Sequence, residues 1–237
     1  MLLQPELFKD YGPNGLQVEG APEVRRIVSG VTASLAFIDS AIAAGADTLL
    51  VHHGLFWRGM DGRLTGWLAA RVRRLMGAGV NLYAYHLPLD AHAQLGNNAQ
   101  LGLRLELRAD ARFGDQDLGF IGPAGAHATL DRLAAAATGA LAKAITVVPG
   151  DGRSLRRVAW CTGGAQSYFE PAIAAGADAF ITGEISEPQA HLARETGVAF
   201  LACGHHATER FGAAAVAAHV AAALGLEHAH IDVENPA

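Results

Sequence analysis

The sequence predicts an α/β protein built from two similar lobes, and the main reason is an internal repeat. RRIVSGVTASLAFIDSAIAAGADTLLVHHG, which begins at Arg25, aligns without a gap with RRVAWCTGGAQSYFEPAIAAGADAFITGEI, which begins at Arg156. Each copy has a β-branched run, a helical stretch and a second apolar run, the pattern of a βαβ unit in a parallel sheet. A hydrophobic fraction of 51% with 17% charged residues agrees with a compact globular protein.

The repeat continues in weaker form beyond these units. After VHHG we expect a helix over about 64–76 and then the strand VNLYAYH. After TGEI we expect a helix over about 187–195 and then the strand VAFLACGH. Each half therefore reads β-α-β-α-β, and another helix follows it, over about 98–105 in the first half and 209–224 in the second.

We expect one domain over residues 1–237 in which the two pseudo-repeated βαβαβ lobes form a single two-lobed unit. The first lobe spans about 1–106 and the second about 150–237. A connector over about 107–149 contains its own helix, near 130–141. A chain of this length can bury a substantial core.

Composition excludes several classes of protein. The formal net charge of −5 gives no general attraction to nucleic acid, and we interpret Arg71, Arg73 and Arg74 as the solvated face of a helix. Cys161 and Cys203 both lie in apolar runs, which favours reduced thiols over a disulfide. The sequence shows neither a signal peptide nor an apolar run long enough to span a bilayer. We therefore expect a cytoplasmic protein with no membrane partner.

The ends of four predicted strands are rich in histidine and carboxylate side chains. In open parallel sheets, ligands gather beyond the carboxyl ends of the strands. His86 and Asp90, and likewise His205 and Glu209, are four residues apart, a spacing that places both side chains on one side of a helical turn. The four motifs are VHHG (His52, His53), YHLPLD (His86, Asp90), TGEISE (Glu184, Glu187) and GHHATE (His205, His206, Glu209).

These donors indicate a metal site with two ions. A single His-His pair or His-x-x-x-Glu spacing is also typical of a loop that caps a helix, but the repeat brings all of them to related strand ends. Imidazole and carboxylate ligands suit Zn, Mn, Fe, Co or Ni in an open site that retains water. Two such ions can share a bridging water and polarise a substrate, as dinuclear hydrolases do. Cys203 could add a further ligand, although its apolar flanks favour an inert buried thiol.

A set of longer motifs resembles a known family. The stretches YGPNGLQVEG, LLVHHGLFW, NLYAYHLPLDAH, GNNAQLG, WCTGGAQS and GHHATERFG are similar to those of the Nif-like dinuclear metal-centre hexameric proteins, also called GTP cyclohydrolase 1 type 2 homologues. The resemblance runs from about Tyr11 to the end of the chain. It implies a two-lobed α/β fold with a dinuclear metal site in the cleft between the lobes, and a homohexamer assembled as a trimer of dimers into a toroid.

The resemblance also implies roles for individual residues. His86 and Glu184 would be catalytic residues that move protons or orient ligands, and His206 would be a neighbour of the site rather than a ligand. The implied metal ligands are His52, His53, Asp90, His205 and Glu209.

The implied function is a hydrolase that acts on a nucleotide or a related heterocycle. The GTP cyclohydrolase name implies that a metal-bound hydroxide attacks C8 of guanine. The alternative is a non-enzymatic toroidal scaffold that binds metal or nucleic acid, although the acidic net charge does not favour nucleic acid. A third interpretation makes the ions purely structural.

Overall fold

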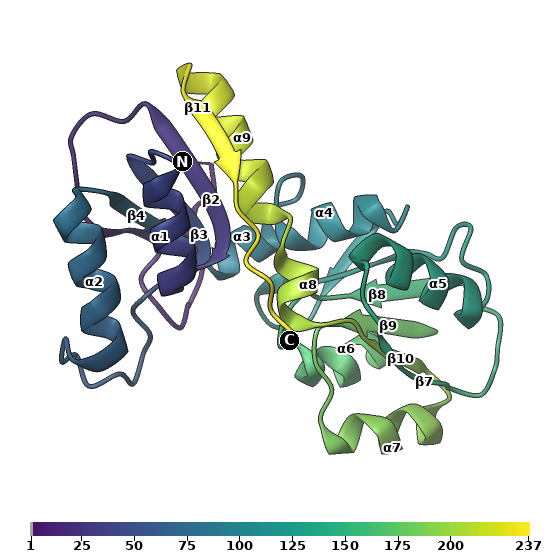
Figure 1. Ribbon diagram of the computed structural model, residues 1–237. Helices are drawn as coiled ribbons and strands as arrows, with labels where there is room; N and C mark the ends of the chain where they lie inside the picture. The colour runs from purple at the N-terminus through teal and green to yellow at the C-terminus, as the bar shows by residue number, and fades with distance from the viewer. Residues whose placement is uncertain (1) are drawn as a thin grey trace. The chain divides into compact units, whose positions relative to one another are not determined.

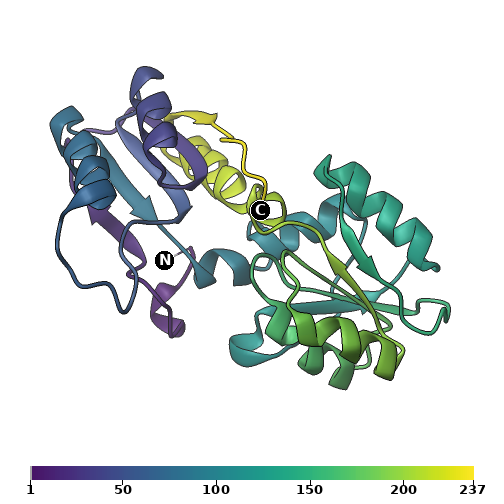
Figure 2. The ribbon, with the colours of Figure 1, turned by 60° about the horizontal axis from the view of Figure 1, so that its bottom comes forward.

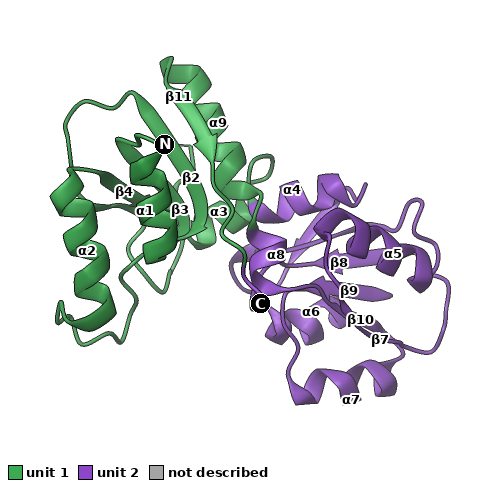
Figure 3. Cartoon of the chain, viewed as in Figure 1, with its two compact units in different colours: residues 1–96, 210–234 green, residues 97–209, 235–237 purple. Residues whose placement is uncertain are grey.

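A computed structural model describes residues 2–237. The chain divides into two compact units (Figure 3): unit 1 comprises residues 1–96 and 210–234, and unit 2 comprises residues 97–209 and 235–237. Each unit contains one β-sheet with helices packed on it (Figure 1). The predicted α/β class with two lobes is therefore confirmed.

The sheet of unit 1 has five strands in the order β1-β4-β3-β2-β11. β2, β3 and β4 are parallel and form the strands of the first βαβαβ segment, β11 adds a parallel strand beside β2, and β1 pairs antiparallel with β4. The strands are β1 (Gly15–Val18), β2 (Arg26–Thr32), β3 (Thr48–His53), β4 (Asn81–Ala84) and β11 (Glu227–His230).

Helices cover both faces of this sheet because successive strand residues point to opposite sides. Val28 belongs to a core with Phe37 of α1 and Leu75 of α2, whereas its neighbour Ile27 packs with Val216 of α9. In Figure 2 the same helices lie along the strands of unit 1. The helical elements are η1 (Pro5–Leu7), α1 (Leu35–Ala43), α2 (Gly66–Ala78), α3 (Leu87–Ala91) and α9 (Gly212–Leu224).

The sheet of unit 2 has six strands in the order β5-β6-β8-β9-β10-β7. β8, β9 and β10 are parallel and form the strands of the second βαβαβ segment, while the pairings of β5, β6 and β7 are antiparallel. The strands are β5 (Ala111–Phe113), β6 (Gly119–Pro123), β7 (Thr146–Val148), β8 (Arg157–Trp160), β9 (Ala179–Thr182) and β10 (Ala199–Ala202).

An aromatic cluster forms part of the core of unit 2. Phe169, Phe180 and Phe200 are each at most 1% exposed, and the ring centroids of Phe169 and Phe200 lie 4.9 Å apart. The helical elements are α4 (Asn97–Arg104), η2 (Asp115–Asp117), α5 (Leu130–Leu141), η3 (Gln166–Tyr168), α6 (Phe169–Ala174), α7 (Glu187–Thr196) and α8 (His205–Glu209).

The compact units divide the chain differently from the expected segments. Residues 107–149, expected to be a connector, supply β5, β6, α5 and β7 to the sheet of unit 2. The physical reason is that three parallel strands leave two edges unpaired: β6 pairs with β8 at one edge and β7 pairs with β10 at the other. The helix that follows each half also belongs to the other unit, since α4 lies in unit 2 and α9 in unit 1.

The sequence predicts no membrane-spanning segment, and the lengths and hydropathy of the helices bear on this prediction. Within residues 2–237, no helix is both long enough and apolar enough to cross a bilayer.

Candidate metal centre

Three histidines gather where β3 and β4 of unit 1 end. His52 and His53 are the last two residues of β3, and His86 follows β4. One ring nitrogen from each of the three lies within 4.8 Å of the others, which is close enough for them to hold one metal ion. The ring centroids of His52 and His86 are 5.1 Å apart, and those of His52 and His53 are 4.5 Å apart. The strand ends therefore bring together the first two motifs, as the sequence predicts.

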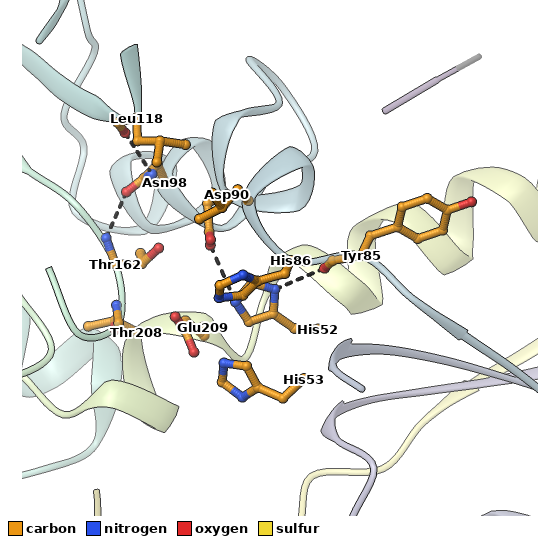
Figure 4. A network of polar contacts seen from close by, with 12 residues as sticks. His52, His53, Tyr85, His86, Asp90, Asn98, Leu118, Thr162, Thr208 and Glu209 are labelled. Carbon is orange, nitrogen blue, oxygen red and sulfur yellow. Dashed lines mark hydrogen bonds and ion pairs between the residues drawn. The ribbon is translucent and has the colours of Figure 1, made fainter. Parts of the chain in front are cut away.

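A neighbouring group holds the Nδ1 atom of each strand-end imidazole. His52 Nδ1 lies 3.0 Å from the carbonyl oxygen of Tyr85 (Figure 4). Because a carbonyl can only accept, Nδ1 is the protonated nitrogen and Nε2 has the lone pair that a metal needs. His52 Nε2 lies 3.5 Å from Asp90 Oδ1, and His53 Nδ1 lies 3.1 Å from Thr32 Oγ1.

His86 is held by a carboxylate that the sequence motifs do not reveal. Asp10 Oδ1 lies 2.7 Å from His86 Nδ1, and Asp10 Oδ2 accepts the N–H of Leu87 at 2.9 Å and the amide of Asn14 at 2.8 Å. Burial raises the pKa of Asp10, but the hydrogen bonds from His86 and Asn14 outweigh it and lower the pKa to about 2. Asp10 is therefore ionised at neutral pH. Because Nδ1 of His86 bonds to Asp10, Nε2 is the ring nitrogen that remains for a ligand or substrate.

In unit 2, α8 presents the second pair of predicted ligands. Its first residue, His205, lies with Nε2 3.2 Å from Glu209 Oε2, so the i,i+4 spacing brings the two side chains into contact. His205 Nδ1 lies 2.6 Å from Glu184 Oε1. Glu209 has a side-chain exposure of only 4%, whereas that of Glu184 is 45%. Glu184 thus fixes the orientation of the His205 ring through Nδ1, and Glu209 contacts the other ring nitrogen, Nε2.

The loop after β8 packs against Glu209. Gly163 donates its N–H to Thr208 Oγ1 at 3.0 Å, and its φ of +70° is in the left-handed region. A Cβ atom at Gly163 would overlap the carboxylate of Glu209, so only glycine fits. Asn98 holds the same loop by accepting the N–H of Thr162 at 2.9 Å (Figure 4). Close packing against the carboxylate therefore explains the first glycine of the motif WCTGGAQS.

Three other candidates have different surroundings. Burial raises the pKa of the Cys203 thiol to about 12, which keeps it protonated and makes it a poor ligand. Glu187 lies 2.9 Å from His191 on the outer surface of α7. His206, the neighbour of His205, is buried.

The donor sets of both units fit divalent metal ions. Oriented imidazole nitrogens and ionised carboxylates are the usual ligands of zinc and of first-row transition metals. Metal-binding histidines in proteins almost always donate their second nitrogen to a carbonyl or carboxylate, and His52 and His205 have such partners here.

The ion pair of His205 predicts a pH dependence for the metal-free protein. The hydrogen bond with Glu209 and, less strongly, that with Glu184 raise the pKa of His205 to about 9 against burial, which lowers it. A raised pKa means that the folded state holds the proton more tightly than the unfolded state, whose pKa is near 6.5. The stabilisation is therefore complete below pH 6.5 and disappears as the pH rises to about 9.

Urea unfolding of the metal-free protein between pH 6 and pH 10 measures this effect. We expect the stability difference between wild type and His205→Asn to shrink across that range. A difference that stays constant from pH 6 to pH 10 would show that the ion pair does not form.

The whole chain is similar to proteins of one family. Residues 1–236 match the family model of Duf34/NIF3 (NGG1p interacting factor 3). A protein of Neisseria meningitidis serogroup B named GTP cyclohydrolase 1 type 2 homolog is 52% identical over 235 residues, which is 99% of this chain and 94% of the relative. A protein of Escherichia coli with the same name is 43% identical, over 99% of this chain and 95% of the relative.

Solved structures agree with the sequence comparisons. A structure described as protein ybgI, of unknown function, superposes with a TM-score of 0.93 at 42% identity and covers 99% of this chain and 95% of its own. TTHA1606 from Thermus thermophilus gives a TM-score of 0.86 at 32% identity, over 98% of this chain and 93% of its own.

Proposed function

Because the chain belongs to the Duf34/NIF3 family, we propose that it is a metal-dependent hydrolase with a dinuclear centre. The proposed ligands are His52, His53 and Asp90 of unit 1 and His205 and Glu209 of unit 2. The proposed substrate is a nucleotide or a related heterocycle, in keeping with the GTP cyclohydrolase 1 type 2 homolog name of its relatives.

The observation that supports this proposal most is the common orientation of the imidazoles. In His52, His53, His86 and His205, Nδ1 contacts a carbonyl, a hydroxyl or a carboxylate. Each ring is therefore fixed before any ion binds, with Nε2 as the remaining nitrogen. Histidines that serve only as packing or as surface groups have no reason to share this arrangement.

The bound ions would supply a Lewis acid that polarises the substrate and lowers the pKa of water. The chain itself supplies the groups that orient and transfer protons. Asp10 holds His86 at 2.7 Å, so the Nε2 atom of His86 is placed to give or accept a proton. Glu184 holds His205 through Oε1 and accepts from Gln166 at Oε2, and its half-exposed side chain is open to a substrate. The proposed catalytic residues therefore remain His86 and Glu184.

A turnover assay on the metal-loaded protein tests this function. The protein is stripped with a chelator, reloaded with Zn, Mn, Fe, Co or Ni, and incubated with GTP and a panel of nucleotides and heterocycles. We expect turnover that requires metal and is absent from the double variant His52→Ala/His205→Ala. No metal-dependent turnover, or equal turnover by the double variant, would overturn the proposal.

The scaffold alternative has a different outcome. A non-enzymatic nucleic-acid-binding protein would bind single-stranded DNA with a steep salt dependence that metal removal leaves unchanged. The arginines of α2 give little support to this alternative. Arg74 is paired with Asp39 at 2.5 Å, and Arg71 lies over the ring of Trp67. The predicted homohexamer is a separate proposal, and sedimentation velocity tests it.

A further inference from the structure

A pocket of about 340 Å³ lies in unit 2 beside two residues of the proposed centre. Glu184, His205 and Lys143 line it, together with the last two residues, Pro236 and Ala237. The backbone of Gly183 and Gly204, in the loops that follow β9 and β10, also lines the pocket. Both polar and apolar atoms line the pocket, which opens to solvent, so a small molecule with a charged group can enter it.

Lys143 lies just beyond the C-terminal end of α5. Lys143 follows α5 directly after Ala142, which has a φ of +51° although it is not a glycine. This left-handed conformation ends the helix, and the Ala142 N–H donates to the carbonyl oxygen of Gly139. The side chain then lies across Gly204, because a Cβ atom there would be 3.0 Å from Lys143 Nζ and 3.1 Å from Lys143 Cδ. Lys143 therefore lies against the residue that precedes His205.

The charge of Lys143 has no acidic partner. Within residues 2–237, no carboxylate lies within 4.0 Å of its ammonium group. Its hydrogen bond is to the neutral carbonyl oxygen of Pro236. An ammonium group has three donors, so two remain for another acceptor. The nearby Glu184 carboxylate is already engaged by His205 at 2.6 Å and by Gln166 at 3.3 Å.

We propose that Lys143 binds an anionic oxygen group of the substrate, such as a phosphate, in this pocket. The inference rests on the proposed function, because it places that group one residue away from the proposed ligand His205. Lysine is a compact point charge that suits phosphate oxygens without demanding one geometry. The substrate would then extend from a phosphate at Lys143 to its reacting part at His205.

Binding of inorganic phosphate, measured by calorimetry on the metal-loaded protein, tests the inference. We expect Lys143→Met, which keeps the apolar stem and removes the charge, to weaken binding about tenfold, and Lys143→Arg to keep most of it. The matched control is Arg132→Met, which removes one positive charge from the exposed surface of α5, the helix that precedes Lys143. This control should bind phosphate like wild type.

A second readout uses the fact that the chain has only two lysines, Lys9 and Lys143. Phosphate should protect Lys143 from an amine-reactive reagent, as seen by mass spectrometry, and should leave the labelling of Lys9 unchanged. Phosphate affinity in Lys143→Met equal to wild type, or no protection of Lys143, would overturn the inference.

Metal analysis of the same samples separates the two proposals. If wild type and Lys143→Met both contain the metal but bind phosphate equally, the inference fails and the proposed centre stands. If neither protein binds metal, the proposed function fails, and with it the premise of the inference.

Discussion

Replacement of His205 by alanine should weaken the binding of a divalent metal by roughly 100-fold or more. The variant loses the imidazole whose Nε2 lies 3.2 Å from Glu209 and leaves that buried carboxylate without its neighbour. Loss of a residue that only orients a ligand costs about 10- to 100-fold in affinity, so loss of a ligand should cost more. Glu184→Ala, which removes the partner of His205 Nδ1 at 2.6 Å, should therefore cost about tenfold.

Competition with a chromophoric chelator measures both affinities. The control is His191→Ala, which removes an exposed imidazole of α7 that pairs with Glu187. This variant should bind metal like wild type. Equal affinity in His205→Ala and His191→Ala would mean that His205 is not a ligand.

Replacement of Asp10 by alanine should lower the free energy of unfolding by about 3 kcal/mol at neutral pH. The carboxylate has a side-chain exposure of 4% and accepts from His86, Leu87 and Asn14, and all three donors would lose their partner. The pKa of about 2 predicts that the stabilisation is present above pH 4 and is lost as the pH falls towards 2.

Urea unfolding at pH 7 checks the size of the effect, and a series down to pH 2 checks its pH dependence. Asp61→Ala is the control, since Asp61 bonds to Arg63 on the exposed surface. We expect the control to unfold like wild type. If Asp10→Ala were as stable as wild type, the carboxylate would not hold the loop that contains His86.

Sequence reasoning predicted the repeated part of the fold well because its signals are local. The apolar runs that become β3 and β9 both follow a Gly-Ala-Asp turn, those that become β2 and β8 both begin at a double arginine, and the repeat doubles each signal. The predicted helix near 130–141 corresponds to α5, Leu130–Leu141. The helix expected over 209–224 corresponds to α9, Gly212–Leu224, while Glu209 ends a separate short helix, α8, that belongs to the other unit.

The edge strands could not be predicted in the same way. β5 and β7 have three residues each, too few for a period-2 pattern to be recognised. β5 has its place in the sheet because it pairs with β6, the next strand along the chain. β7 has its place because it pairs with β10, which is distant in sequence. Short strands of this kind are defined by a partner and not by their own residues.

The site was predictable to the extent that its residues lie at strand ends. His52, His53 and His86 lie together as the parallel strands require, and His205 contacts Glu209 as the i,i+4 spacing requires. Asp10 was missed because it lies 76 residues from His86, in a segment without a regular element. The contact of Glu184 with His205 could not be predicted from residue spacing either, because only the tertiary fold brings the ends of β9 and β10 together.

The most direct test of the proposed centre is the metal content of the reconstituted protein, measured by mass spectrometry. We predict two divalent ions per chain in wild type and fewer than one in the double variant His52→Ala/His205→Ala. Wild-type protein without stoichiometric metal, or a folded double variant that still contains two ions, would contradict the account.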